Sequence, residues 1–166
     1  MLRILVVLAL ILVLVIVSVV IGSAASLEVG GGVIQVFSIP VTIEIPDCTH
    51  SFGQWKNHPD AWPAEEIAVG GVTYSKAEVI VILDTEPGSD ATYILAHQLI
   101  ATKLNLLRGA DASALDTTVG DADEWLGDHP PLGSAPSDPD RAQGIALAET
   151  LDEYNTGVIG PGACED

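Results

Sequence analysis

The densest group of chemically versatile side chains lies in the first half of the chain. It combines imidazoles, indoles and one lysine, and it consists of His50, Trp55, Lys56, His58 and Trp62. Imidazole nitrogens serve as general bases and metal ligands, and an exposed indole offers a flat face for a sugar ring. The group therefore predicts a ligand or metal site as one alternative. The alternative that we favour is a set of aromatic core residues with structural hydrogen bonds.

Two further histidines, His97 and His129, complete the candidates for a general base. His97 lies on the apolar stripe of an expected helix, which favours a hydrogen-bonded core histidine over a catalytic one. The sequence contains no serine nucleophile elbow, no P-loop and no dinucleotide-binding fingerprint. A hydrolase that pairs His58 or His97 with an acid is therefore the last of the functions that we weigh.

Acidic residues far outnumber basic ones, with 23 Asp and Glu against 6 Lys and Arg and a formal net charge of −17. Since phosphate contacts need a basic face, this balance excludes a nucleic-acid partner. The acid excess keeps an exported protein soluble or suits a high-salt environment. We expect no cofactor, with calcium as the alternative, although no EF-hand spacing is present. The acidic candidates are Asp111, Asp116, Asp121, Asp123 and Glu124.

The chain has two cysteines, Cys48 and Cys164. In an exported chain such a pair usually forms a disulfide, and no CxxC or HExxH spacing accompanies it to suggest metal binding. The bond would join the start of the globular region to the end of the chain. Its closure would remove about 4–5 kcal/mol of chain entropy from the unfolded state.

The first 25 residues are almost wholly apolar, and Arg3 precedes the continuous stretch from Ile4 to Ile21. Small residues near the end of this segment suit cleavage of a signal peptide. The length of the segment suits a single transmembrane anchor, because it can cross a hydrocarbon core of about 30 Å. Both alternatives place the chain after Ser26 outside the cytoplasm. We therefore expect a secreted or membrane-anchored protein.

Residues 26–46 are an expected linker that contains a β-strand from Phe37 to Ile45. Apolar and polar residues alternate along this strand, and Pro40 favours a position at a sheet edge. One alternative is that its apolar face packs on the protein's own domain. The other alternative is that the strand pairs with another copy of the chain or with a surface-protein partner.

Residues 47–166 predict a mainly α domain, a small bundle of about four helices with a short β-hairpin. The hairpin is expected around Gly70-Gly71, and the helices over 76–83, 91–108, 112–126 and from 139 to about 156. Because Pro59 and Pro63 interrupt the segment after Cys48, we expect a long ordered aromatic loop there.

The expected helix over 91–108 carries two amides on one side, Gln98 and Asn105. A buried amide must be paired. We expect this pair to form a structural polar network that ties the loop 48–63 and the last turn of the chain to the bundle, with ligand recognition as the alternative.

Several short motifs occur in order between residues 48 and 164. They are Cys48, Gly53, Trp55-Lys56-Asn57-His58-Pro59, Trp62-Pro63, Gln98-Leu99-Ile100-Ala101-Thr102-Lys103-Leu104-Asn105, Tyr154-Asn155-Thr156-Gly157 and Gly160-Pro161-Gly162-Ala163-Cys164. With these motifs the segment resembles a family of exported bacterial and archaeal domains that has no assigned biochemical role. The chain departs from the family pattern at Gln54, where an aromatic is common, and at Thr102, where alanine is common. The resemblance implies an exported, disulfide-closed, mainly helical domain and assigns no catalytic residue.

These observations predict an exported or membrane-anchored cell-surface protein with a structural or interaction role and no enzymatic activity. The first alternative is a carbohydrate- or metal-binding module centred on Trp55, His58 and Trp62. The second alternative is the hydrolase.

Overall fold

The computed structural model describes residues 26–29, 32–35 and 47–165 of the chain. It divides into two compact units, residues 1–43 and 44–166. In the first unit, β1 (Ser26–Val29) pairs antiparallel with β2 (Gly32–Gln35). This hairpin lies in the segment that was predicted to be a linker, although paired glycines between two short strands are a typical hairpin signal. The expected strand Phe37–Ile45 and the apolar segment 1–25 lie outside the described residues.

The second unit is a mainly helical domain with an antiparallel two-stranded hairpin, as the sequence predicts. Its strands are β3 (Glu66–Val69) and β4 (Val72–Ser75), paired with Val69 opposite Val72. Four helices have more than seven residues, namely α3 (Lys76–Asp84), α4 (Ala91–Arg108), α5 (Thr118–Asp128) and α6 (Asp140–Asn155). A short helix α2 (Phe52–Asn57) and a 3-10 turn η1 (Pro59–Ala61) precede the hairpin.

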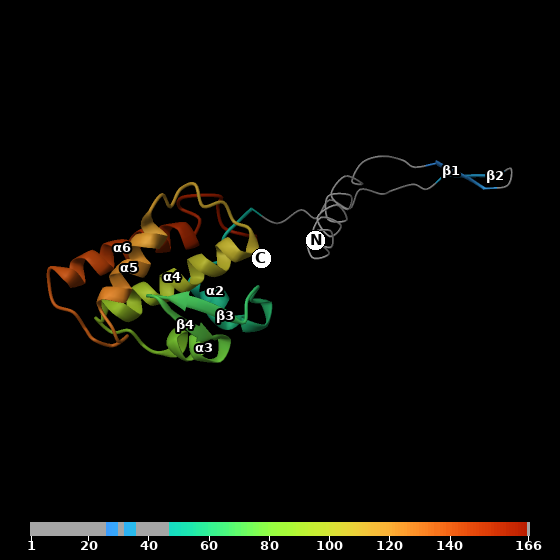
Figure 1. The fold of residues 1–166 in the computed structure, drawn as a ribbon. Helices are drawn as coiled ribbons and strands as arrows, with labels where there is room; N and C mark the ends of the chain where they lie inside the picture. The colour runs from blue at the N-terminus through green and yellow to red at the C-terminus, as the bar shows by residue number, and fades with distance from the viewer. Residues whose placement is uncertain (1–25, 30–31, 36–46, 166) are drawn as a thin grey trace, which may run out of the picture. The chain divides into compact units, whose positions relative to one another are not determined.

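Helix α4 runs through the centre of this unit (Figure 1). Helices α5 and α6 lie on one side of it, and the hairpin, α2 and α3 lie on the other. The sequence explains the central position, because apolar residues cover most of the circumference of α4 and Leu95, Leu99 and Leu104 are fully buried. The helix has the predicted bounds: Asp90 caps its first turn through the backbone N–H of Thr92.

Two helix boundaries differ from the sequence-based expectation. Helix α5 begins at Thr118 instead of residue 112, because Asp116 adopts a positive φ of 45°, which a right-handed helix cannot include. The last helix begins at Asp140, and Pro139 is its N-cap residue instead of its first helical residue.

The expectation of a long ordered aromatic loop over residues 48–63 is corrected by α2, which gives part of this segment regular structure. The Ser51 hydroxyl accepts the backbone N–H of Gln54 and caps the helix, which ends at Asn57 before the first proline. Pro59 lies at the first position of η1, where its missing N–H costs nothing. Pro59 therefore lies at the junction between α2 and η1 and prevents neither of them.

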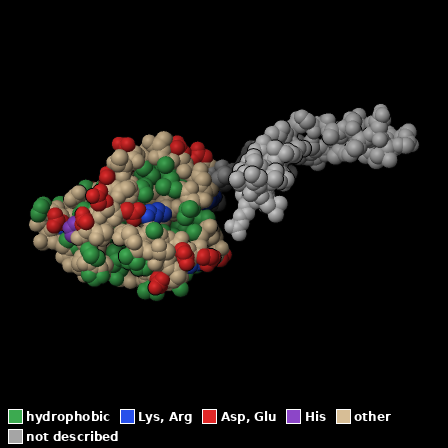
Figure 2. Space-filling view, in the orientation of Figure 1, with side chains coloured by type: hydrophobic (Ala, Val, Ile, Leu, Met, Phe, Trp, Pro, Cys, Tyr) green, Lys and Arg blue, Asp and Glu red, His purple; other side chains and the backbone are tan. Residues whose placement is uncertain are grey.

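The core gathers the three tryptophans and the buried face of α4. Helix α6 approaches the Trp125 indole closely at Gly144, where an added Cβ would lie 2.7 Å from the ring. Acidic side chains are spread over the visible surface of the domain, whereas Lys and Arg atoms appear at few points (Figure 2). Within the residues that the structure describes, no helix combines the length and the apolar character needed to cross a bilayer.

Candidate functional site around the disulfide

The predicted disulfide is present and joins Cys48 to Cys164, with their Cα atoms 4.9 Å apart. The neighbouring backbone reinforces this connection. The Thr49 N–H donates to the Gly162 carbonyl at 2.8 Å, and the Cys164 N–H donates to the Thr49 carbonyl at 2.9 Å. The two ends of the helical unit are therefore held together by the disulfide and by a short parallel β-bridge between Thr49 and Ala163.

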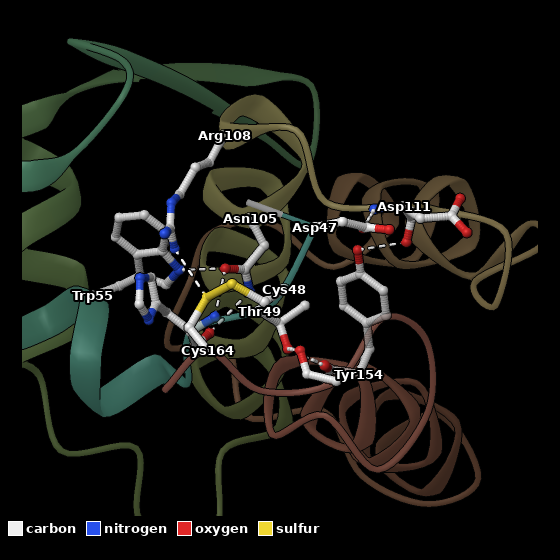
Figure 3. Close-up of a disulfide and its surroundings, with 11 residues drawn as sticks. Asp47, Cys48, Thr49, Trp55, Asn105, Arg108, Asp111, Tyr154 and Cys164 are labelled. Atoms are coloured by element: carbon white, nitrogen blue, oxygen red, sulfur yellow. Dashed lines mark hydrogen bonds between the residues drawn. A yellow bond between two sulfur atoms is a disulfide. The ribbon is translucent and has the colours of Figure 1, made fainter. Parts of the chain in front are cut away.

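The Tyr154 side chain of α6 fixes the same region from the other side (Figure 3). Its hydroxyl donates to the Asp111 carbonyl at 2.8 Å, and its own carbonyl accepts the Thr49 hydroxyl at 3.0 Å. Burial raises the pKa of Tyr154 to about 12, with the carboxylates of Asp111 and Asp47 adding to the effect. The phenol therefore stays protonated at physiological pH and acts as a structural donor.

Asn105, which is fully buried on α4, has all four amide hydrogen-bonding positions occupied. Its Oδ1 accepts the backbone N–H of His50 at 2.8 Å and the indole N–H of Trp55 at 2.9 Å. Its Nδ2 donates to the His50 carbonyl at 2.9 Å and to Asn155 Oδ1 at 3.0 Å. One side chain thus connects the segment after the disulfide, α2 and α6.

Gln98 lies two turns earlier on the same helix and contacts the same residue of α6. Asn155 Nδ2 donates to both the backbone carbonyl and Oε1 of Gln98, each at 3.0 Å. The Thr102 hydroxyl donates to Asn155 Oδ1 at 3.0 Å and lies in the same network. Thr102 therefore supplies a buried hydrogen bond between α4 and α6.

The two indoles of the aromatic group are core residues in this structure. Trp55 is 2 % exposed and Trp62 is 7 % exposed, and the Trp62 indole N–H donates to the Trp55 carbonyl at 2.8 Å. A sugar ring needs an accessible indole face for stacking. These two rings therefore do not provide the platform on which the carbohydrate-binding alternative depends.

His97 is 5 % exposed, and its Nε2 lies 2.8 Å from the Ile82 carbonyl oxygen. Because a carbonyl only accepts, Nε2 carries the proton. The ring stacks on Phe52 at 4.8 Å between centroids. Burial lowers the pKa of His97, and the Ile82 carbonyl opposes part of this shift. The arrangement is that of a neutral core histidine.

Lys56, His58 and His129 do not converge on one site. Lys56 forms an ion pair with Asp84 at 3.4 Å, and its ammonium lies 5.9 Å from the Phe52 ring centroid. His58 is exposed, whereas the His129 ring stacks on Trp125 at 4.1 Å. Among the described residues, no group of three His, Cys, Asp or Glu side chains has a geometry that could hold a metal ion.

The acidic candidates for calcium take part in local structural contacts. Asp123 accepts the Gly70 N–H at 2.9 Å and pairs with Lys103. Asp121 accepts the Thr117 hydroxyl at 2.8 Å. Two hydrogen bonds from Ser113 lower the pKa of Asp111. These carboxylates belong to turns, to a helix start and to an ion pair with α4.

A cleft of about 320 Å³ opens beside the disulfide. It is lined by His50, Gln54, Trp55, His58, Ala61 and Arg108. The Arg108 Nη1 donates to Cys164 Sγ at 3.2 Å, so the guanidinium lies against the disulfide (Figure 3). The His50 ring meets the Trp55 ring edge-on, with 5.2 Å between centroids.

Three of the six residues that line this cleft, His50, Trp55 and His58, are among the sequence-based site candidates, whereas Gln54, Ala61 and Arg108 are not. The available signal for Arg108 was its spacing, because Arg108 follows Asn105 by three residues and therefore lies on the same side of α4. Comparisons with protein-family models, with curated proteins and with solved structures found no significant match.

Proposed function

We propose that this protein is an exported module, secreted or held at the membrane by its N-terminal segment, with a structural or interaction role at the cell surface. The disulfide between Cys48 and Cys164 is the observation that carries this proposal. Disulfides form and persist in oxidising compartments and are rare in the cytosol. The apolar first 25 residues, which follow the pattern of an export segment, supply the second support.

A non-catalytic role is supported by the use that the domain makes of its polar side chains. The Asn105 amide and the His97 imidazole are hydrogen-bonded inside the core, and the half-buried Gln98 amide is hydrogen-bonded to Asn155. A catalytic base must instead reach a substrate and exchange protons with it. These groups connect α4 to α2, α3 and α6.

Export is tested by expressing the full chain with a C-terminal tag in a cell that has a secretion pathway. A membrane-impermeant amine reagent is then added to intact cells, and a cytosolic protein serves as the control for leakage. We expect the chain to be labelled and the control to stay unlabelled. A chain that becomes labelled only after lysis contradicts export.

The thiol state is tested on the same material by alkylation under denaturing conditions, followed by mass measurement. We expect no label at Cys48 or Cys164 unless a reductant is added first. Two labelled thiols without reduction would remove the support that the disulfide gives to export.

The interaction role is tested through the strand expected over Phe37–Ile45, whose alternating apolar residues suit pairing with a second chain. We expect deletion of these residues to weaken self-association, measured by analytical ultracentrifugation. A chain that is monomeric both with and without the segment contradicts self-association through this strand.

A further inference from the structure

The cleft beside the disulfide has an unusual electrostatic character for this protein. The whole chain has 23 acidic residues and 6 basic ones, yet none of the residues that line the cleft is acidic. Instead, the lining places one arginine, two histidines and a glutamine around a buried indole. Although the protein is strongly acidic, an anion that enters this cleft would approach a cationic side chain and would not be repelled by a lining carboxylate.

Arg108 differs from the three lysines of the described residues. Lys56, Lys76 and Lys103 each form an ion pair with a carboxylate. Within the part of the chain that the structure describes, Arg108 forms no such pair, and its hydrogen-bond partner is the sulfur of Cys164. Sulfur is a weak acceptor, and a guanidinium has five N–H donors in a rigid fork. Most of the hydrogen-bonding capacity of Arg108 is therefore left for another acceptor.

The fork of a guanidinium matches two oxygens of a carboxylate or phosphate, and hydrogen bonds between ionised partners are about twice as strong as neutral ones. Imidazole rings donate at least one N–H in either protonation state. His58 is exposed at the cleft, so its ring can reach a bound group. The volume of about 320 Å³ lies at the lower end of the range for small-molecule sites.

Much of the cleft wall is also in position before any ligand arrives. The contact with Cys164 places Arg108 beside the disulfide, and Asn105 on the same helix fixes Trp55 and the backbone of His50. A site whose walls are already fixed loses less conformational entropy on binding. We propose that this cleft binds a small oxyanion, a carboxylate or phosphate group of a ligand about the size of one acidic sugar, with Arg108 as the main contact.

This binding site goes beyond the structural role proposed above and stands on separate observations. Export or self-association can fail experimentally while the cleft still binds an anion. Equally, the cleft can fail to bind an anion in a chain that is exported and disulfide-bonded.

The test uses the full chain, labelled with ¹⁵N, with its disulfide closed and its N-terminal segment kept soluble in a neutral detergent. Inorganic phosphate, glucuronate and neutral glucose are added separately, at constant ionic strength. Two-dimensional NMR follows the Arg108 Nε–H and the Trp55 indole N–H. We expect saturable shifts with phosphate, glucuronate or both, and none with glucose; the stronger binder of the two identifies the oxyanion.

Arg108→Gln is the decisive variant, and Arg141→Gln is its matched control. Both substitutions remove one positive charge. Arg141 does not line the cleft and donates to the Ser89 carbonyl, so its substitution controls for the loss of charge alone. We expect Arg108→Gln to weaken binding about tenfold or more, in line with the loss of charged hydrogen bonds, and Arg141→Gln to change it by less than about twofold.

The proposal is overturned if neither phosphate nor glucuronate binds saturably. It is also overturned if Arg108→Gln and Arg141→Gln lose the same amount of affinity. If the NMR spectrum shows that Arg108→Gln is unfolded, His58→Ala replaces it, because His58 is exposed and the change leaves the core intact. We expect this variant to bind at least about threefold more weakly. Unchanged affinity in His58→Ala then overturns the proposal.

Discussion

Trp55 and Asn105, which are 50 residues apart in the sequence, share a buried hydrogen bond of 2.9 Å from the indole N–H to the amide Oδ1. The same oxygen accepts the backbone N–H of His50, and the amide nitrogen donates to the His50 carbonyl (Figure 3). One side chain of the central helix therefore sets both the position of α2 and the course of the chain next to the disulfide. Removing this amide affects the fold and the candidate cleft together.

Asn105→Asp is expected to destabilise the protein by about 3 kcal/mol or more, although the two side chains have nearly the same shape. The aspartate cannot donate to the His50 carbonyl or to Asn155 Oδ1, so it places a carboxylate oxygen against two acceptors. Urea unfolding followed by circular dichroism measures the change. Asn57→Asp is the control: Asn57 is exposed, and we expect it to cost less than about 1 kcal/mol. Equal costs at the two positions would contradict the role of the buried amide.

Replacing both Cys48 and Cys164 by alanine is expected to lower the free energy of unfolding by about 4 kcal/mol. The two residues are 116 positions apart, so the disulfide greatly restricts the unfolded chain. Guanidinium unfolding with and without a reductant measures the effect. The double variant should be insensitive to the reductant. A native chain whose unfolding midpoint is unchanged by reduction would show that the bond contributes little.

His97 is expected to make the protein less stable as the pH falls below about 6.5. Burial lowers the pKa of His97 in the folded state below the value of 6.5 expected for the unfolded chain. As the pH falls, the unfolded chain therefore binds a proton before the folded chain does. The stabilisation is fully present above pH 6.5 and is lost as the pH falls towards the lower folded-state pKa. Thermal unfolding across this range measures the loss.

His97→Gln provides the comparison for that pH dependence. Glutamine keeps a donor for the Ile82 carbonyl, which His97 Nε2 contacts at 2.8 Å, but it does not titrate. We expect the variant to keep nearly the same stability from pH 7 down to pH 5. A variant that follows the native profile would assign the pH dependence to other groups.

Gly144→Ala and Gly120→Ala are expected to change stability in opposite directions. An added Cβ at Gly144 in α6 would lie 2.7 Å from two carbons of the Trp125 indole, so packing of α5 against α6 must shift, at a cost of about 1–3 kcal/mol. At Gly120 in α5 an added Cβ meets nothing within 4 Å, and the better helix propensity of alanine should stabilise by about 0.5 kcal/mol. Differential scanning calorimetry of the two variants measures both. A stabilised Gly144→Ala would contradict the close approach of the helices.

Much of the local structure could be predicted from short-range signals. Helix α4 has its predicted bounds because its caps, Asp90 and Gly109, and its apolar periodicity are encoded within one continuous segment. The β3–β4 hairpin was predictable from Gly70-Gly71, since both residues adopt the positive φ that its tight turn requires. Helix α2 was not predicted, because Pro59 and Pro63 exclude one regular helix over the whole segment but leave room for a short helix before them.

The sequence alone determined that the domain is mainly helical, where α4 and the β3–β4 hairpin lie and that its two cysteines pair. These features depend on local periodicity, on capping and turn residues, and on there being two cysteines in an expected exported chain. The tertiary structure decided which side chains meet. Nothing in the spacing of Arg108 and Cys164 indicates a contact between residues 56 positions apart. Such contacts depend on how the helices pack, and packing is set by the combined shape of the whole core instead of by any short stretch of sequence.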